Sequence, residues 1–444
     1  MTKTINQYVC NSCGHIEAKW SGRCSSCGDW NSFNEVTTVK KSSIGKTRQV
    51  VVTPTKVKDI EASGIARIST GFKDFNQVLG GGIVPGSVIL LSGDPGIGKS
   101  TLALQAAIHL AQELPVLYVS GEETAHQIKI RADRLGNIPI SLDLLTETAV
   151  ENITPIITGG EYKTIIIDSI QTMGMEEITS NPGSISQVTT SAHELRMAAK
   201  NSDVALILIG HVTKEGGIAG PKLLEHLVDV VLYLEGDKLG GFKVLRGVKN
   251  RFGSTNEVGI FEMTKTGLTT IENPSAALLA ERKIGSGSAV FAAVEGTRPF
   301  LVEVQALTAA SVFGYPKRTA TGIDINRLNL LIAVLARNVG LNLNTQDIYV
   351  NIVGGLKINE PAADLAIILA ITSAFKNQTI AKDLIVFGEV GLNGEIRTVS
   401  HILKRLNEAK KMGFKRAIGP STKSYAGLRG VKTIKEAIKI AFES

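Results

Sequence analysis

The sequence predicts an α/β protein of several domains, with a largely parallel sheet at its centre. Short apolar runs alternate with amphipathic segments over residues 65–271, and a glycine-rich turn ending in a lysine directly follows the first of these runs. Four cysteines gather near the N-terminus. With 444 residues, the chain is too long for a single hydrophobic core and should divide into two or three domains.

The composition excludes membrane and secreted classes of protein. Hydrophobic residues make up 43% and charged residues 20% of the chain, which is ordinary for a soluble protein. The N-terminus is polar and no apolar run approaches membrane-spanning length, so we expect no membrane association and a cytoplasmic location. Residues 1–60 contain nine Lys or Arg against four Asp or Glu. This excess suits a polyanion such as nucleic acid, and equally a solvated basic linker.

The cysteines form two Cys-x2-Cys pairs separated by ten residues. This spacing folds two tight turns around one tetrahedral ion, with four thiolates as ligands, whereas disulfides would be unusual in the cytosol. So small a segment cannot build an apolar core, and metal binding would supply its folding energy. The sequence therefore predicts a zinc site at Cys10, Cys13, Cys24 and Cys27.

The chain then divides by composition. Residues 37–64 are polar and basic, which indicates a linker. The following segment contains apolar runs at 88–91, 116–119, 164–167, 204–209 and 230–234. Strands that are apolar on both faces and separated by helices predict a parallel sheet covered on both sides. We therefore predict a zinc module over 1–36, a linker over 37–64, a nucleotide-binding core over 65–272 and a separate α/β domain over 273–444, in which Asn393-Gly394 marks a hairpin turn.

Residues 93–100 form a complete G-x4-G-K-S motif between the apolar run 88–91 and an apolar-rich segment that begins at Leu102. A strand before and a helix after are what this phosphate-binding loop requires. Its glycines let backbone N–H groups wrap around phosphates, Lys99 reaches the β- and γ-phosphates, and Ser100 binds Mg²⁺. The residues predicted to bind ATP are Gly93, Asp94, Pro95, Gly96, Ile97, Gly98, Lys99, Ser100 and Thr101.

Three other apolar runs end in polar residues that should meet the phosphates at the same sheet edge. Asp168 is expected to hold Mg²⁺ together with Ser100, although an acid in this position can also cap a helix. We choose Glu122 as the catalytic group that orients the attacking water, with Glu123 as the alternative. His211 could bind the nucleotide and sense its γ-phosphate, or it could be structural.

In this order, the four strand-end motifs resemble those of the RecA-like ATPases. With the cysteine cluster and the run Lys-Asn-Arg-Phe-Gly at 249–253, essentially the whole chain resembles a bacterial DNA-repair branch of that family. The resemblance implies a RecA-like P-loop core with an N-terminal zinc ribbon or knuckle. It also implies a homo-oligomeric ring, a hexamer by analogy, that binds single-stranded and branched DNA and drives branch migration alongside the RecA recombinase.

The same resemblance assigns roles to basic residues. Lys249 and Arg251 would act in trans on the ATP of a neighbouring subunit, where an arginine finger contributes roughly 10³–10⁵ in rate. A basic surface hairpin is the plainer interpretation. The loop 214–222 would present Lys214 and Lys222 to DNA at the axis of the ring, or it could be a simple connector.

The C-terminal domain resembles the proteolytic domain of Lon. The position of Lon's nucleophilic serine is occupied by Ala362, and the position of its general-base lysine by Leu403, with Lys404 one residue away. A methyl group cannot attack a carbonyl, so we expect an inactive protease fold. Lys317 and Arg318 could give this domain a surface that faces DNA.

Three functional hypotheses follow. The leading one is a DNA-dependent ring ATPase of recombinational repair. The second is an ATP-dependent peptidase, which the residues at 362 and 403 oppose. The third is a RecA-like scaffold or signalling ATPase whose zinc module binds protein, and the basic charge of the chain favours it less.

Overall fold

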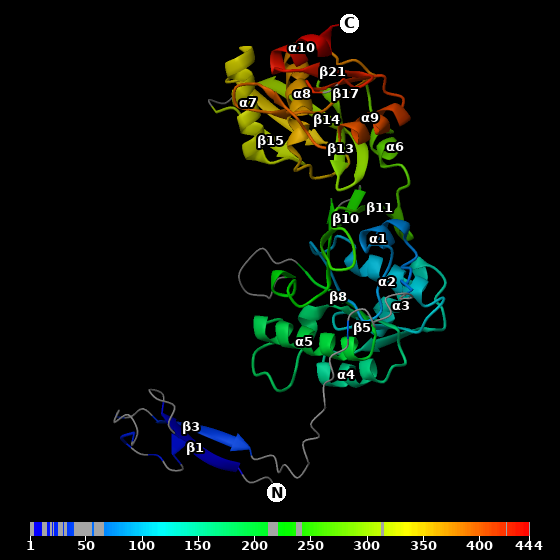
Figure 1. Ribbon diagram of the computed structural model, residues 1–444, viewed down its shortest axis with the longest axis vertical. Helices are drawn as coiled ribbons and strands as arrows, with labels where there is room; N and C mark the ends of the chain where they lie inside the picture. Colours follow the sequence, from blue (N-terminus) through cyan, green and yellow to red (C-terminus); the bar gives the residue numbers. More distant parts are fainter. Residues whose placement is uncertain are drawn as a thin grey trace. The chain divides into compact units, whose positions relative to one another are not determined.

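The computed structural model describes residues 4–10, 16–17, 20, 22–24, 30, 33–39, 56, 66–211, 221–236, 242–311, 315–422 and 424–443. The chain falls into two compact units, Met1–Gly64 and Ile65–Ser444 (Figure 1). The second unit contains two large sheets. We call residues 66–272 the core domain and residues 273–443 the C-terminal domain.

The N-terminal unit contains a three-stranded antiparallel sheet in the order β2-β1-β3. Its strands are β1 (Thr4–Cys10), β2 (Ile16–Glu17) and β3 (Phe33–Val39). β3 pairs with β1 along its whole length, so it extends to Val39, three residues past the predicted end of the zinc module at residue 36. Cys24 is buried, whereas Cys13 and Cys27 lie outside the described residues.

A nine-stranded sheet forms the core domain, in the order β12-β11-β10-β9-β4-β8-β7-β5-β6. The strands β9, β4, β8, β7, β5 and β6 pair in parallel with their neighbours in this order. The strands β9, β10, β11 and β12 form an antiparallel meander. The strands are β4 (Val88–Gly93), β5 (Val116–Ser120), β6 (Leu142–Thr146), β7 (Thr164–Asp168), β8 (Ala205–Ile209), β9 (Val230–Gly236), β10 (Phe242–Asn250), β11 (Val258–Thr264) and β12 (Gly267–Thr270). All five predicted apolar runs are strands.

Helices cover both faces of this sheet, as the apolar runs predicted. They are α1 (Lys73–Val78), α2 (Lys99–Leu110), α3 (Ala125–Leu135), α4 (Val150–Thr158) and α5 (Ile185–Asn201), with short 3-10 turns η2 (Ile170–Thr172) and η3 (Pro221–Leu223). Because side chains alternate along a strand, Ile89 and Leu91 of β4 pack in one core with α2, and Val88 and Leu90 pack in the other with α4 and α5.

The register of the parallel strands brings four strand ends to one level. Ser120 lies opposite Asp168, and Asp168 lies opposite Ile209. Glu122 and His211 each lie two residues beyond the strand residue that is paired with Asp168, so both follow their strands at this edge of the sheet. This edge of the core domain also receives the carboxyl end of β4, where the glycine-rich loop begins.

The C-terminal domain is a seven-stranded mixed sheet in the order β15-β16-β14-β13-β17-β20-β21, with a small pair β18-β19. Its strands are β13 (Ser288–Glu295), β14 (Arg298–Ala310), β15 (Arg318–Thr321), β16 (Gln346–Ile352), β17 (Leu384–Val386), β18 (Glu389–Val390), β19 (Ile396–Arg397), β20 (Arg416–Pro420) and β21 (Leu428–Val431). Its helices are α6 (Pro274–Leu279), α7 (Ile325–Val339), α8 (Asp364–Lys376), α9 (Ile402–Lys411) and α10 (Ile434–Phe442), with a 3-10 turn η4 (Pro361–Ala363).

Two sequence expectations can be checked in this domain and across the chain. Asn393 and Gly394 connect the antiparallel strands β18 and β19, with Gly394 at a φ of 78°, so the predicted hairpin is confirmed. Within the described residues, no helix is both long enough and apolar enough to cross a membrane.

Candidate nucleotide site

The glycine-rich loop joins β4 to the first turn of α2. Gly93 has a φ of 149°, and a Cβ added there would lie 2.3 Å from the carbonyl oxygen of Leu234. Gly98 precedes the helix at a φ of 115°. At Gly96 the opposite holds, since among the described residues no atom lies within 4 Å of an added Cβ. The loop is therefore fixed at its two ends and open at its middle, where phosphate oxygens would approach its N–H groups.

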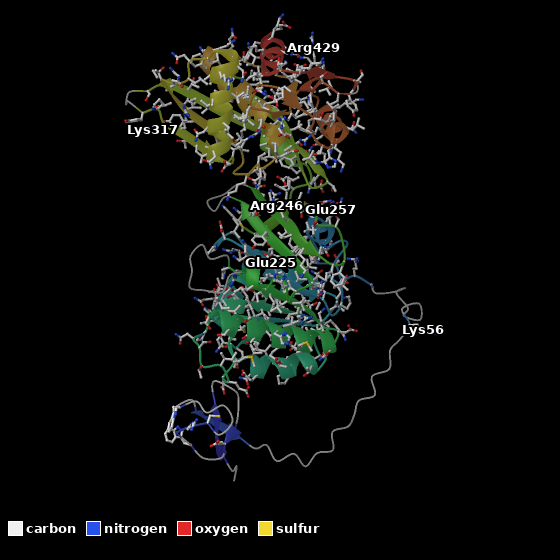
Figure 2. The ribbon with its side chains drawn as sticks, turned by 60° about the vertical axis from the view of Figure 1, so that its left-hand side comes forward. Lys56, Glu225, Arg246, Glu257, Lys317 and Arg429 are labelled. Carbon is white, nitrogen blue, oxygen red and sulfur yellow. The ribbon has the colours of Figure 1, made fainter. Side chains whose placement is uncertain are left out.

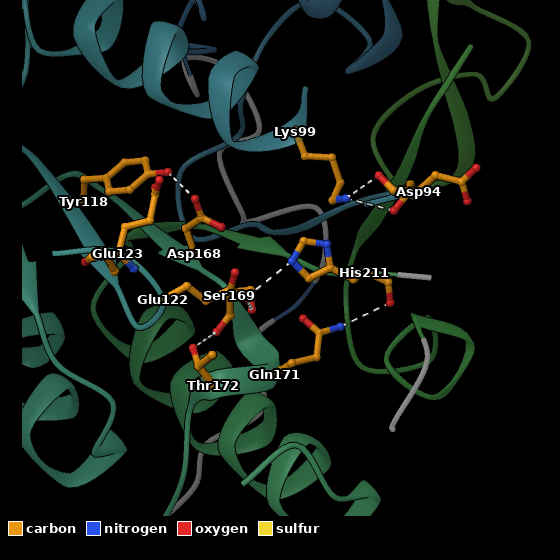
Figure 3. Close-up of polar contacts among 12 residues, drawn as sticks. Asp94, Lys99, Tyr118, Glu122, Glu123, Asp168, Ser169, Gln171, Thr172 and His211 are labelled. Atoms are coloured by element: carbon orange, nitrogen blue, oxygen red, sulfur yellow. Dashed lines mark hydrogen bonds and ion pairs between the residues drawn. The ribbon is translucent and has the colours of Figure 1, made fainter. Parts of the chain in front are cut away.

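Lys99 lies at the start of α2 and is 3% exposed. Its ammonium donates hydrogen bonds to the carbonyl oxygens of Gly93 and Asp94, both at 2.9 Å (Figure 3). The side chain is thus folded across the loop that it would serve. A cavity of about 400 Å³ opens at this point. Its lining includes Gly96, Gly98, Lys99, Ser100, Thr101, Arg131, Arg134, His211 and the turn residues Met263, Thr264, Lys265 and Gly267.

Asp168 ends β7 and is 5% exposed. The hydroxyl of Tyr118 in the neighbouring strand β5 donates a hydrogen bond of 2.5 Å to one of its carboxylate oxygens. Burial, followed by the charge of Asp168, raises the pKa of Tyr118 well above its ordinary value, so the hydroxyl keeps its proton. Among the described residues, Tyr118 is the donor that orients this carboxylate, and the second oxygen can take another partner, such as a hydrated divalent cation.

Glu122 lies in the loop after β5, where Thr124 begins α3 through a capping box with Gln127. Its carboxylate accepts a hydrogen bond from the hydroxyl of Ser169, and its Oε1 lies 3.4 Å from Nε2 of His211 (Figure 3). The contact with His211, followed by that with Ser169, lowers the pKa of Glu122 to about 2 despite partial burial. An ionised, half-exposed carboxylate at this edge can accept a proton or orient a water molecule.

The alternative acid, Glu123, is engaged elsewhere. Its carboxylate forms an ion pair with Arg131 of α3, and its backbone is bonded in both directions to the hydroxyl of Ser120. These contacts direct Glu123 toward α3 and leave Glu122 as the acid that faces Ser169 and His211.

His211 connects the site to the loop that follows β8. Gln171 donates from its side-chain amide to the carbonyl oxygen of His211 at 3.3 Å. The second ring nitrogen, Nδ1, is buried and has no hydrogen-bond partner among the described residues. Residues 212–220 begin directly after it and lie outside the described part of the chain, so Lys214 is not placed. Lys222 is exposed in η3.

Lys249 and Arg251 lie at the opposite edge of the sheet. β10 runs antiparallel to β9, so Asn250 is opposite Val230, which is in turn beside Ile89 at the start of β4. The glycine-rich loop begins four residues further along β4, or about 13 Å at the usual rise per residue. These two basic residues therefore lie at the end of the sheet opposite the glycine-rich loop of their own chain.

Both residues have partners within the core domain. The ammonium of Lys249 donates to the carbonyl oxygens of Glu225 and Val228 at 2.6 and 2.8 Å. Arg251, whose side chain is 54% exposed, forms an ion pair of 3.2 Å with the buried Asp229. Lys249 is thus tied to backbone, whereas Arg251 is presented at the surface.

Three family models match the chain. An AAA domain matches residues 53–217, a rubredoxin metal binding domain matches residues 8–35, and subunit ChlI of Mg-chelatase matches residues 310–423. Among curated proteins, the DNA repair protein RadA of Halalkalibacterium halodurans is 48% identical over 99% of both chains. RadA of Bacillus subtilis is 50% identical over 95% of this chain and 93% of its own, and RadA of Escherichia coli is 45% identical over 98% and 97%.

The chain belongs to the RadA family of DNA repair proteins.

Membership of the RadA family confirms the resemblance drawn from the motifs to bacterial DNA-repair proteins. The chain is an ATP-hydrolysing P-loop enzyme with a RecA-like core and an N-terminal zinc ribbon. In the C-terminal domain the matching model is subunit ChlI, and the likeness to Lon stays a prediction. There Ala362 is buried in η4, and Leu403 on α9 is 58% exposed.

The sequence motifs that resemble the RadA family did not indicate a role for Asp229. The structure places this residue where α5, β4 and the end of β10 meet. One of its carboxylate oxygens accepts from Lys200 of α5 at 3.0 Å and from Arg251 at 3.2 Å, and the other accepts from the backbone N–H of Val88 at 3.1 Å. In the sequence it is one acid before an apolar run, and its partners are distant along the chain. Tyr118 and Gln171 were missed for the same reason.

The remaining predicted DNA contacts lie in the C-terminal domain of this RadA family member. Lys317 and Arg318 lie at the start of β15, where the backbone N–H of Lys317 donates to Asp347 and the guanidinium of Arg318 contacts Asn329. Lys222 belongs to the core domain instead. The predicted DNA contacts that the structure describes are therefore divided between the core domain and the C-terminal domain.

Proposed function

We propose that this chain is a DNA-dependent ATPase of recombinational repair that works as a homo-oligomeric ring, a hexamer by analogy. It would bind single-stranded and branched DNA and drive branch migration alongside the RecA recombinase. One observation carries the ring: the phosphate loop and Arg251 lie at opposite edges of the same sheet. In a ring of identical subunits, the edge of one subunit that bears Arg251 can face the nucleotide edge of the next.

Within the site, the proposed roles follow the geometry of the four strand ends. The glycine loop and Lys99 would hold the triphosphate of ATP, and Ser100 with Asp168 would hold Mg²⁺, which stabilises charge on the phosphates when bound. The donor set fits, because the loop is open at Gly96, and the buried Asp168 has one carboxylate oxygen with no hydrogen-bond partner among the described residues. Glu122 would orient the attacking water and accept its proton.

Signalling between ATP and DNA is proposed to run through His211. Its ring contacts Glu122, and its backbone begins the loop 212–220. A γ-phosphate that attracts the ring would alter the start of this loop, which carries Lys214 and ends beside Lys222. Lys317 and Arg318 are proposed as further DNA contacts. Cys10, Cys13, Cys24 and Cys27 would bind Zn²⁺ through four thiolates.

The test is the rate of ATP hydrolysis with and without single-stranded DNA, together with imaging in the presence of a non-hydrolysable ATP analogue. We expect DNA to stimulate turnover and to lie within a closed ring. Lys99→Ala should abolish turnover while the protein stays folded. A wild-type rate that DNA leaves unchanged, with no ring on DNA, would refute the proposal.

A further inference from the structure

A turn of the C-terminal domain lies against the loop that follows Arg251. This turn, residues 295–298, connects β13 to β14. The backbone N–H of Thr297 donates to the carbonyl oxygen of Asn256 at 2.8 Å, and its hydroxyl contacts both carboxylate oxygens of Glu257 at 2.8 and 2.9 Å. Glu257 is one of the residues labelled in Figure 2. Asn256 and Glu257 end the loop 252–257, which begins one residue after Arg251.

The contact is a close backbone approach. Gly296 has a φ of 58°, and a Cβ added there would lie 1.5 Å from the carbonyl oxygen of Asn256. Any side chain at residue 296 must therefore push the turn and the loop apart. The turn is fitted to this loop and does not merely lie near it.

Ion pairs flank the turn on both sides. Arg246 of β10 pairs with Glu295, and Arg298 pairs with Asp74 of α1. Asp74 is 4% exposed and also accepts from the backbone N–H of Ile260 in β11 at 3.0 Å. Beneath them, apolar residues of β10 and β11 pack into the core of the C-terminal domain: Val244, Val258 and Ile260. The turn is held in place by burial as well as by charge.

The C-terminal domain also holds the turn from its own side. Lys404 of α9 donates from its ammonium to the carbonyl oxygen of Thr297 at 3.0 Å. Lys404 is the residue beside the expected position of a protease lysine, and here it supports the turn. The helix α9 can therefore have a structural role that does not depend on a nucleophile in this domain.

The loop is fixed at its start as well. The backbone N–H of Arg251 donates to the carbonyl oxygen of Asp229 at 3.2 Å, and the amide of Asn250 donates to Val78 at 3.2 Å. Arg67 donates to the carbonyl oxygen of Phe252 at 2.8 Å. With both ends fixed, the loop has little freedom, and the exposed guanidinium of Arg251 is presented in a defined direction.

We propose that the turn 295–298 of the C-terminal domain, supported by Lys404, positions the loop 252–257 so that Arg251 reaches the nucleotide of the neighbouring subunit. Gly296, Thr297 and Lys404 are then positioning residues for ATP hydrolysis in trans. This inference rests on the proposed ring. Its physical basis is that displacing a reacting group by about 1 Å can cost roughly 100-fold in rate.

The experiment compares Gly296→Ala, Thr297→Val and Lys404→Met with wild type in the full-length chain. Lys411→Met, on the exposed end of the same helix, is the matched control. ATP affinity should stay within about twofold in all four variants, because the phosphate loop is untouched. Turnover should fall by up to roughly 100-fold in Gly296→Ala, less in the other two, and not at all in Lys411→Met. Thermal unfolding checks that each variant is folded, and Thr297→Val preserves side-chain shape if Gly296→Ala is unstable.

Mixed rings separate this inference from the function on which it rests. Gly296→Ala or Thr297→Val subunits keep an intact phosphate loop, and Lys99→Ala subunits keep an intact Arg251 loop. Each variant is expected to be inactive or weak alone. Mixing them should restore turnover wherever the intact phosphate loop of a turn variant faces the intact Arg251 loop of a Lys99→Ala subunit. Full activity of the turn variants, or loss without rescue by mixing, would overturn the inference. Failure of the proposed function would appear separately, as a wild-type rate that DNA does not change.

Discussion

The charge of Glu122 depends on one neighbouring ring. Its pKa of about 2 lies below the ordinary value of 4.5, so the carboxylate is ionised at every pH above about 2, and acidification from pH 8 to 5 leaves it charged. In His211→Ala the largest cause of this lowering is lost, so the pKa of Glu122 should rise toward 4.5. We expect the acid limb of kcat/KM for ATP to move to higher pH in this variant. A profile that does not move would contradict the assignment.

The same residue gives a direct test of the proposed base. Glu122→Gln preserves shape but cannot accept a proton, so kcat should fall by roughly 10²–10⁴ with ATP binding retained. Glu123→Gln is the matched control, because Glu123 pairs with Arg131 and should affect turnover far less. Steady-state hydrolysis and nucleotide binding measure both. An equal loss in the two variants would show that neither acid acts alone.

Lys249 and Arg251 are two residues apart, yet their contacts predict different defects. In the proposed ring, Arg251→Ala should keep ATP binding and lose turnover, because the neighbouring subunit's site would lose an exposed guanidinium. Lys249→Met leaves two backbone carbonyl oxygens without their charged donor, so the free energy of unfolding should fall by about 1–3 kcal/mol. Urea titration and hydrolysis rates separate the two effects. A stability loss confined to Arg251→Ala would reverse this assignment.

At the scale of elements, Asp229 joins β4, α5 and the end of β10. It is 2% exposed and faces two cations, Lys200 and Arg251. Asp229→Asn weakens the contacts of a buried carboxylate with two partly exposed cations and should lower stability by about 1–3 kcal/mol. Asp133→Asn is the control, because its pair with Lys129 is exposed and should contribute about 0–1 kcal/mol. Chemical denaturation of both variants makes the comparison, and equal losses would contradict it.

The elements that the sequence predicted are those with a strong local pattern. The five apolar runs became β4, β5, β7, β8 and β9 because strands buried on both faces need apolar residues at every position. The edge strand β6 was missed, since its residues are half-buried or exposed and do not form such a run. β11 and β12 belong to an antiparallel meander, and the alternation in their sequences is too short to be distinctive.

In the candidate site, too, only the residues with a clear sequence signal could be predicted. Strand ends of a parallel sheet must meet at one edge, so Glu122, Asp168 and His211 could be grouped without a structure. Their supporting partners could not be predicted in this way. Tyr118 reaches Asp168 across 50 residues and Asp229 reaches Val88 across 141, and such pairings depend on tertiary packing that no local pattern encodes.

At the scale of the whole molecule, each subunit of the proposed ring would carry two halves of a reaction centre, with the phosphate loop at one edge of the core sheet and Arg251 at the other. A head-to-tail contact between identical subunits joins unlike surfaces, and it closes into a ring when the rotation between neighbours allows it. The C-terminal turn would add a third contribution, because it contacts Asn256 and Glu257 at the end of the loop that follows Arg251. On this view the C-terminal domain is needed for hydrolysis even though Ala362 occupies the position expected for a nucleophile.

An enzyme whose site is completed by a neighbour must lose activity on dilution. We expect ATP turnover per subunit to fall as the protein is diluted below the concentration at which the proposed rings dissociate. An isolated subunit would lack the guanidinium of Arg251 from a neighbouring subunit. Arg251→Ala should show a low rate at every concentration, since assembly gives its sites nothing further. Mass photometry at each concentration reports the assembled fraction, which turnover should follow. A rate per subunit that stays constant while rings dissociate would place the whole reaction centre within one chain, and Arg251 would then have no role in trans.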